Sequence, residues 1–209
     1  MTMDVEDVMQ LAPVIPVLVV DEVDHAVPIA RALVAGGLPV LEVTLRTPAA
    51  LDVIRAMAGV EGAVVGAGTV LNPQALEAAV SAGARFIVSP GLTEPVAQAA
   101  AGAQVPLLAG VANAGDIMRG LDLGLSRFKF FPAAAAGGIP ALTALTGPFG
   151  EVRFCPTGGV TQANAAEWLA LDAVLCVGGS WMVPRGTPDP AAIEAAARAA
   201  AELARPAHA

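Results

Sequence analysis

The sequence predicts an α/β protein with a single (β/α)8 barrel, the architecture called a TIM barrel, over residues 1–209, opened by a short extra helix. Eight short apolar segments of strand character alternate with helix-like segments, and no linker interrupts the series. Alanine, valine, leucine and glycine dominate, which suits helices packed on a parallel sheet. A chain of 209 residues would form a minimal barrel, and a doubly wound open sheet is the structural alternative.

The expected elements follow one another in a regular order along the chain. Strands are expected at residues 14–20, 40–45, 63–66, 86–89, 107–110, 127–131, 153–155 and 173–177. Helices are expected near residues 24–35, 48–57, 72–82, 93–101, 113–123, 139–145, 164–169 and 190–204. Asn72 and Thr47 each precede a proline, as capping residues do at the start of a helix. The segment 4–11 is expected to form the extra helix and to close the bottom of the barrel.

Composition and charge exclude several classes of function. The net charge of −8 offers no basic surface for nucleic acid or for an anionic membrane. The first residues are acidic and no apolar run approaches the roughly 18 residues of a membrane span, so we expect a cytoplasmic protein. Cys155 and Cys176 lack the spacing of metal ligands and are expected to be buried thiols. His25 and His208 are expected at the surface, and we expect neither a metal nor a cofactor.

Lys129 is the only lysine in the chain, whereas the ten other basic residues are all arginines. It lies in the apolar stretch from Arg127 to Pro132. Apolar surroundings disfavour the charged form of an amine and make a nucleophilic free base available, which arginine cannot provide. The alternative is that an arginine-biased composition leaves one lysine by chance. The neighbouring residues must therefore decide between the two interpretations.

Polar residues interrupt the apolar pattern at the carboxyl ends of the expected strands, where barrels of this class carry their active sites. Period-two alternation places Glu42 and Arg46 on one face of the second strand, and Lys129 and Phe131 on one face of the sixth. A buried carboxylate needs a partner, so Glu42 is either a general acid/base held against the amine or half of a structural ion pair with Arg46 or Lys129. Arg46 is either a clamp for a substrate carboxylate or part of a salt bridge at the rim.

Glycine turns follow both the seventh and the eighth strand. The seventh strand runs into Thr157, Gly158 and Gly159, and the eighth runs into Gly178, Gly179 and Ser180. Small residues let backbone N–H groups approach an anion, and a short helix beginning at Ser180 would add its positive dipole end. A lone glycine pair is usually only a tight turn. Two pairs at these successive strand ends favour a phosphate site, because the same two loops bind phosphate in many such barrels.

Six motifs carry a resemblance to a known family. They are Glu42-Val-Thr-Leu-Arg46-Thr, Gly66-Ala-Gly-Thr69-Val-Leu-Asn-Pro73, Ser89-Pro-Gly91, Phe128-Lys129-Phe-Phe-Pro132, Phe154-Cys-Pro-Thr157-Gly-Gly159 and Val177-Gly-Gly-Ser180-Trp. In these motifs, which occur in order over nearly the whole chain, the sequence closely resembles the 2-keto-3-deoxy-6-phosphogluconate (KDPG) aldolases, which are class I lyases. The length and order of the matches make the resemblance specific.

The resemblance implies a homotrimer of the Entner–Doudoroff pathway that cleaves the phosphorylated keto-acid to pyruvate and glyceraldehyde 3-phosphate. It implies that Lys129 forms a Schiff base and that Glu42 transfers protons. It further implies that the substrate is held by Arg46, Thr69, Phe131, Thr157, Gly158, Gly159, Gly179 and Ser180. Of these, the glycines and the serine would face the phosphate group.

Two departures from the family pattern qualify this picture. Ala134 stands where family members often carry a glutamate, and Ala112-Asn113 replaces a common Thr-Pro or Ser-Thr element. Asn113 can still cap the helix that follows it. Within the enzyme class the alternatives are the C4-epimeric galactonate substrate and 4-hydroxy-2-oxoglutarate, which lacks a phosphate. A non-catalytic barrel that binds phosphosugars is the alternative from a different class.

Overall fold

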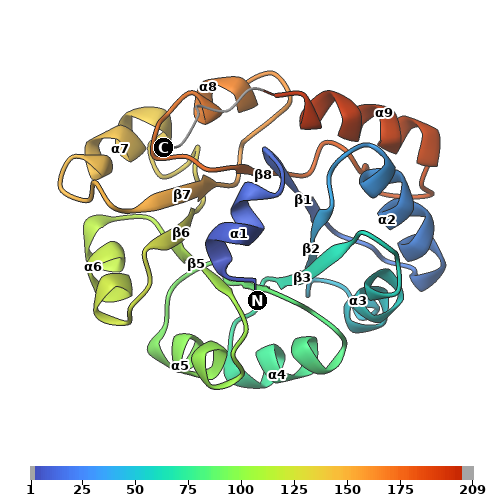
Figure 1. The fold of residues 1–209 in the computed structure, drawn as a ribbon, viewed down its shortest axis with the longest axis horizontal. Helices are drawn as coiled ribbons and strands as arrows, with labels where there is room; N and C mark the ends of the chain where they lie inside the picture. The colour runs from blue at the N-terminus through green and yellow to red at the C-terminus, as the bar shows by residue number, and fades with distance from the viewer. Residues whose placement is uncertain (1–2, 204–209) are drawn as a thin grey trace.

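A computed structural model describes residues 3–203 of the chain. Within these residues, eight strands form one parallel sheet in the order β7-β6-β5-β4-β3-β2-β1-β8. Isolated bridges from Phe154 to Val174 and from Thr157 to Gly178 close the sheet between its two ends. The expected (β/α)8 barrel is confirmed, and the open doubly wound sheet is wrong (Figure 1). Residue 204 of the expected last helix and His208 lie outside the described residues.

The strands are short. They are β1 (Val14–Leu18), β2 (Val40–Thr44), β3 (Val64–Gly68), β4 (Ile87–Val88), β5 (Leu107–Val111), β6 (Arg127–Phe130), β7 (Arg153–Pro156) and β8 (Val177–Gly179). The expected bounds of the eighth strand, 173–177, are wrong. Its ladder is made with β1, whose first residue Val14 pairs with Val177, so the strand begins only there. Val174 is buried but makes only an isolated bridge, to Phe154.

Helices alternate with the strands and surround the barrel (Figure 1). They are α1 (Val5–Gln10), the 3-10 turn η1 (Val23–His25), α2 (Ala26–Ala35), α3 (Ala50–Ala58), α4 (Pro73–Ser81), α5 (Glu94–Gly102), α6 (Ala114–Asp122), α7 (Gly138–Thr146), α8 (Ala165–Leu169) and α9 (Pro190–Ala201). The cap at Asn72 is confirmed, because its side-chain oxygen accepts from the Ala75 N–H at 2.8 Å. The cap at Thr47 is wrong, because its hydroxyl donates to the Val20 carbonyl oxygen at 2.8 Å instead.

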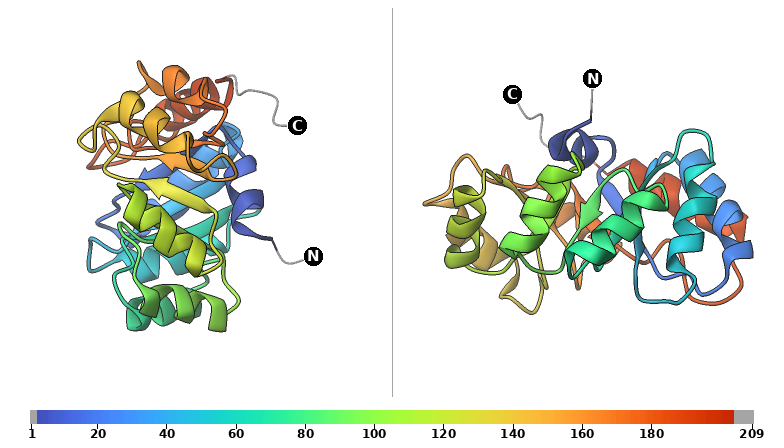
Figure 2. Two further views of the ribbon diagram at one scale, coloured as in Figure 1. Left: turned by 90° about the vertical axis from the view of Figure 1, so that its left-hand side faces the viewer. Right: turned by 90° about the horizontal axis from the view of Figure 1, so that it is seen from below.

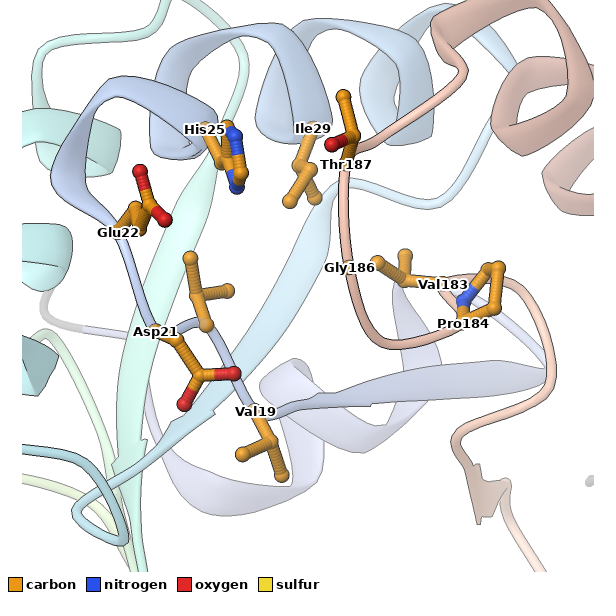
Figure 3. Close-up of a pocket in the computed structure, with 10 residues that line it drawn as sticks. Val19, Asp21, Glu22, His25, Ile29, Val183, Pro184, Gly186 and Thr187 are labelled. Carbon is orange, nitrogen blue, oxygen red and sulfur yellow. The ribbon is translucent and has the colours of Figure 1, made fainter.

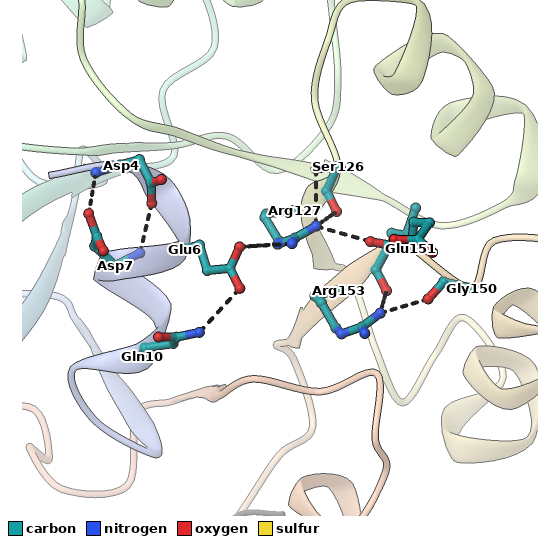
Figure 4. Close-up of polar contacts among 10 residues, drawn as sticks. Asp4, Glu6, Asp7, Gln10, Ser126, Arg127, Gly150, Glu151 and Arg153 are labelled. Atoms are coloured by element: carbon teal, nitrogen blue, oxygen red, sulfur yellow. Dashed lines mark hydrogen bonds and ion pairs between the residues drawn. The ribbon is translucent and has the colours of Figure 1, made fainter. Parts of the chain in front are cut away.

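Helix α1 lies across one end of the barrel, as expected (Figure 2). Its side chains Val8 and Met9 are fully buried and pack against residues of the barrel interior. Glu6, on the same helix, forms an ion pair with Arg127, the first residue of β6, with 2.7 Å between Nη2 and Oε2 (Figure 4). The closed end is therefore the one at which the strands begin, which leaves the carboxyl ends of the strands for a site.

Two apolar layers hold the sheet in place. The inner one fills the barrel and includes Phe86 and Cys155, while the outer one packs the strands against the helices and includes Phe128 and Phe130. Each fully buried phenylalanine contributes roughly 1.5–3 kcal/mol of hydrophobic stabilisation. Because successive side chains of a strand point to opposite faces, the two outer phenylalanines turn Lys129 into the barrel. Among residues 3–203, no helix is both long enough and apolar enough to cross a lipid bilayer.

Candidate active site

The central feature of the barrel mouth is a buried pair of Lys129 and Glu42. The lysine Nζ donates to Glu42 Oε1 at 2.9 Å and to Oε2 at 3.3 Å. The side chains are only 5% and 3% exposed, respectively. Burying two charges costs free energy that their attraction often fails to recover, so such a pair is weak evidence for a stabilising role. Glu42 lies in the middle of β2, and Lys129 lies next to the last residue of β6 and lines a cavity at the carboxyl ends of the strands. Barrel enzymes carry their chemistry at that end, so this placement favours a functional role.

Glycine at position 68 makes room for this pair. Gly68 lies at the end of β3, beside Thr44 in the register of β2. A β-carbon at Gly68 would overlap the carboxylate of Glu42 and would lie 2.7 Å from its Cγ. Contacts that short do not persist in proteins, so any larger residue would displace the carboxylate. The backbone of β3 therefore fixes where the oxygens of Glu42 sit relative to the lysine amine.

Arg46 and Thr69 lie together at the rim of the barrel, after β2 and β3. Arg46 is exposed, and its Nε donates to Thr69 Oγ1 at 3.1 Å. Within the described residues it forms no ion pair, so the expected alternatives of a rim salt bridge or a bond to Glu42 are not found. Thr69 has a φ of 60°, which is uncommon for a β-branched residue and costs roughly 1–3 kcal/mol. Strain of this kind often accompanies a functional site.

Lys129, with Glu42 bonded behind it, faces a cavity of about 320 Å³ at the barrel mouth. Its lining unites the ends of β6, β7, β8, β1 and β2, and consists of Val17, Val19, Arg46, Lys129, Phe131, Thr157, Gly158, Gly159, Val160, Gly178, Gly179, Ser180 and Arg185. The ring of Phe131 lies 5.4 Å from the lysine Nζ, within cation–π range. Every candidate substrate-contacting residue except Thr69 lines this cavity, and Thr69 is bonded to Arg46 of its wall.

The two glycine turns form one side of the cavity. Gly158 and Gly159 have φ angles of +95° and +81°, which side chains rarely tolerate. On β8, a β-carbon at Gly178 would overlap the buried side chain of Thr157, and one at Gly179 would overlap the ring of Trp181. The close packing keeps backbone N–H groups near the surface of the cavity. An anion can approach backbone donors at such a turn.

The expected short helix at Ser180 is not present. Residues 181–182 form a turn and the chain continues without helical structure to residue 189. Pro184 and Pro188 remove two backbone donors within this stretch, and Gly186 adopts a φ of +103°, so a helix cannot propagate. The predicted contribution of a helix dipole to this wall of the cavity is therefore wrong.

Sequence reasoning missed four residues of the cavity. Val17, Val19 and Val160 supply apolar wall, and Arg185 supplies a third cationic side chain beside Arg46 and Lys129. The valines carry no polar signal that separates them from core residues. Arg185 lies five residues after Ser180, on the loop that follows an expected phosphate turn, and that position was the available signal.

The two departures from the family pattern have clear structural places. Ala134 is exposed, and its N–H donates to the carbonyl oxygen of Gly158 at 2.9 Å, which ties the loop after β6 to the glycine turn after β7. Asn113 caps α6 as expected, since its side-chain oxygen accepts from the Asp116 N–H at 3.0 Å. Neither substitution alters the Lys129–Glu42 pair itself. Residues 3–203 contain no group of three or more His, Cys, Asp or Glu side chains that could hold a metal ion.

Comparison with known proteins agrees with this geometry. The sequence profile of the family described as KDPG and KHG aldolase matches residues 5–196. The chain belongs to this family. A 2-dehydro-3-deoxy-phosphogluconate aldolase of Zymomonas mobilis is 57% identical to it over 202 residues, which are 97% of each protein.

Solved structures of the family show the same fold. The crystal structure of the 2-keto-3-deoxy-6-phosphogluconate aldolase of Zymomonas mobilis ZM4 with 3-phosphoglycerate matches with a TM-score of 0.97 and 56% identity, covering 100% of both chains. The structure of the KDPG aldolase from Legionella pneumophila, with pyruvate captured as a covalent carbinolamine intermediate, matches with a TM-score of 0.85 and 46% identity, covering 95% of both. The barrel of this family member therefore follows that of its relatives throughout.

Proposed function

We propose that this chain is a class I aldolase that cleaves 2-keto-3-deoxy-6-phosphogluconate to pyruvate and glyceraldehyde 3-phosphate through a Schiff base on Lys129. The observation that carries the proposal is the 2.9 Å contact between the lysine Nζ and Glu42 Oε1, buried at the edge of a cavity large enough for a small substrate. An amine that can lose its proton to a neighbouring carboxylate is a nucleophile. Membership of the aldolase family supports the same chemistry.

The reaction begins when Glu42 accepts a proton from Lys129. The neutral amine attacks the C2 ketone of the substrate, and the resulting carbinolamine loses water as Glu42 returns a proton to the leaving hydroxyl. The product is an iminium ion, whose positive nitrogen withdraws electrons from the C3–C4 bond. Each proton transfer by a positioned carboxylate contributes about 10²–10⁴-fold in rate.

Cleavage follows when Glu42, now ionised, takes the proton of the C4 hydroxyl directly or through a water molecule. The C3–C4 bond breaks, its electron pair moves toward the iminium nitrogen, and the aldehyde leaves. Protonation of the enamine at C3 and hydrolysis of the imine then release pyruvate and restore the lysine. The iminium supplies the electron sink that other aldolases obtain from a bound metal ion, so the mechanism assigns no step to a metal.

The remaining residues would bind the two ends of the substrate. Arg46, held by Thr69, is placed to form a bidentate contact with the substrate carboxylate. Thr157 would orient the middle of the substrate, and the ring of Phe131 would cover the reacting carbons from one side of the cavity. The phosphate would lie against Gly158, Gly159, Gly179 and Ser180, at the turns that follow β7 and β8.

We propose in addition that the chain is one domain over residues 1–209 and works as a cytoplasmic homotrimer in the Entner–Doudoroff pathway. The sequence resemblance supports these statements, and the uninterrupted alternation of strands and helices supports a single domain. Light scattering of the purified protein tests the trimer, and a mass other than three chains would contradict it.

Turnover measurements test the function. The wild-type chain should cleave the gluconate-derived substrate, while Lys129→Arg should lower kcat by more than about 10⁴-fold, because the guanidinium cannot act as a nucleophile. Full activity of Lys129→Arg, or activity abolished by a chelator, would contradict the mechanism. The galactonate-derived epimer and 4-hydroxy-2-oxoglutarate are assayed side by side, and faster turnover of either would replace the assigned substrate. Tight phosphosugar binding without any turnover would indicate the non-catalytic barrel.

A further inference from the structure

The loop at residues 183–187, which follows β8, separates two cavities at the mouth of the barrel. Its other residues line a neighbouring cavity of about 160 Å³, which they share with Glu22 and His25 of the connection between β1 and α2 (Figure 3). Within the described residues, Arg185 is the only member of the loop that lines the active-site cavity. The loop therefore lies between the two cavities and contributes one cationic residue, Arg185, to the cavity in which the substrate would lie.

The backbone on either side of Arg185 explains this arrangement. Pro184 fixes its own φ and cannot donate a backbone hydrogen bond, and Gly186 adopts a φ of +103° that only glycine takes readily. Together they turn the chain sharply around a single residue. Arg185 is exposed, so its side chain is not packed into the protein and can reach a ligand in the cavity.

Arg185 differs from the other two cations of the cavity in having no bonding partner in the part of the chain that the structure describes. Lys129 is bonded to Glu42, and the Nε of Arg46 is bonded to Thr69. Among residues 3–203, the Arg185 guanidinium makes neither an ion pair nor a side-chain hydrogen bond. All five N–H donors of its guanidinium are therefore available, in the planar fork that suits phosphate oxygens.

The wall that would hold the phosphate is otherwise neutral. It offers backbone N–H groups of the glycine turns and the hydroxyl of Ser180, and the helix that would have added a positive dipole end is not formed. A phosphate monoester carries about −1.5 to −2 charges at pH 7, and the chain itself carries a net charge of −8. Without Arg185, neutral donors alone would have to bind this anion against the negative electrostatic potential of the whole protein.

We propose that Arg185 binds the phosphate group of the substrate and sets the preference of this enzyme for phosphorylated keto-acids. This inference rests on the proposed function, because it assigns the charge partner of the phosphate in the same cavity. Arg185 is a specificity-determining residue and takes no part in the proton transfers at Lys129. Its contribution appears only when the substrate carries a phosphate.

The test compares the substrate with its unphosphorylated counterpart, 2-keto-3-deoxygluconate. Arg185→Ala should lower the ratio of kcat/KM for the phosphorylated over the unphosphorylated compound by about tenfold to a hundredfold, mainly through KM, as expected for the loss of a charge-assisted contact. Arg185→Lys should recover part of the ratio, because a point charge remains. Arg85→Ala is the matched control: it removes the same charge from an exposed position just before β4, at the closed end of the barrel, and should leave the ratio unchanged.

An unchanged ratio in Arg185→Ala overturns the inference, and so does an equal loss on both compounds, which would indicate a structural role for the loop. Failure of the proposed function would look different, because the wild-type chain would then cleave neither compound. In that case the dissociation constant of inorganic phosphate, measured by calorimetry, decides. Binding weakened by Arg185→Ala but not by Arg85→Ala supports the inference, and equal binding by all three chains overturns it.

Discussion

Strand β6 carries two basic residues on one face, and each is paired with a glutamate at a different end of the barrel. At the closed end, Arg127 bonds Glu6, and the side chains are 20% and 36% exposed. At the open end, Lys129 bonds Glu42, and the side chains are 5% and 3% exposed. The two basic residues lie two positions apart on the same strand. The pairs nevertheless differ in burial, in whether the cation is an arginine or a lysine, and in how many further hydrogen bonds that cation makes.

The two cations differ in how many of their hydrogen-bond donors are already bonded within the protein. Arg127 also donates to the carbonyl oxygens of Ser126 and Glu151, at 3.2 and 3.0 Å, and to Ser126 Oγ at 3.0 Å (Figure 4). The charge of Arg127 is permanent and its N–H donors already make hydrogen bonds, so this residue suits a structural contact between α1 and the sheet. The hydrogen bonds of Lys129 to described residues go only to Glu42, so this base remains open to a proton exchange and to a ligand. Burial with few bonds marks the chemical pair, and partial exposure with many bonds marks the structural one.

The largest expected effect in this comparison comes from Glu42→Gln. It removes the proton acceptor at the open end while retaining the shape of the side chain, so kcat should fall by about 10²–10⁴-fold while pyruvate still binds. Stopped-flow turnover and a calorimetric titration with pyruvate measure the two quantities. If unfolding by urea instead shows a stability loss of about 3–5 kcal/mol and the remaining folded protein turns over normally, the pair is structural.

A smaller effect is expected from Gly68→Ala, which tests whether the position of the Glu42 carboxylate matters. The added β-carbon would push the carboxylate away from Lys129. A displacement of about 1 Å at a reacting group can cost on the order of 10²-fold in rate, and we expect a loss of about 10- to 100-fold in kcat. Gly102→Ala, at the end of α5 with no atom within 4 Å of the added carbon, is the control and should retain wild-type kcat. Equal rates in the two variants would contradict the assigned geometry.

The smallest effect is expected at the closed end, from Glu6→Gln. The pair it breaks is partly exposed and screened by solvent, so the free energy of unfolding should fall by less than about 1 kcal/mol. Both kcat and KM should stay within about twofold of wild type, because α1 lies at the opposite end of the barrel from the cavity. Urea denaturation and steady-state kinetics on the same preparation check both values. A large loss of activity would mean that the two ends of β6 are coupled.

Much of this molecule could be predicted from its sequence because the signals are local. The alternation of strand-like and helix-like segments predicted the barrel. The apolar neighbours of the single lysine and the period-two placement of Glu42 predicted the central pair. Each of these signals can be read from residues that are close together in the chain. Asn72 before proline predicted a cap for the same reason. These features needed no knowledge of which segments meet in space.

The features that escaped prediction depend on contacts between distant segments. The start of β8 is set by its register with β1. The apolar run that begins at residue 173 therefore indicated buried residues, and it did not indicate where the hydrogen-bonded strand begins. The Thr47 hydroxyl donates a hydrogen bond to the Val20 carbonyl oxygen on the neighbouring loop, so it does not cap the helix. Arg185 reads as an ordinary exposed arginine until the loop is folded, because only the fold shows which cavity it lines.

Reduction with borohydride in the presence of pyruvate tests the central claim most directly. The imine that we propose would be trapped as one stable adduct, and mass spectrometry of the digested protein should locate it at Lys129 and find none in Lys129→Arg. An adduct on the terminal amine, or no adduct in an active wild-type enzyme, would contradict a Schiff base at this site.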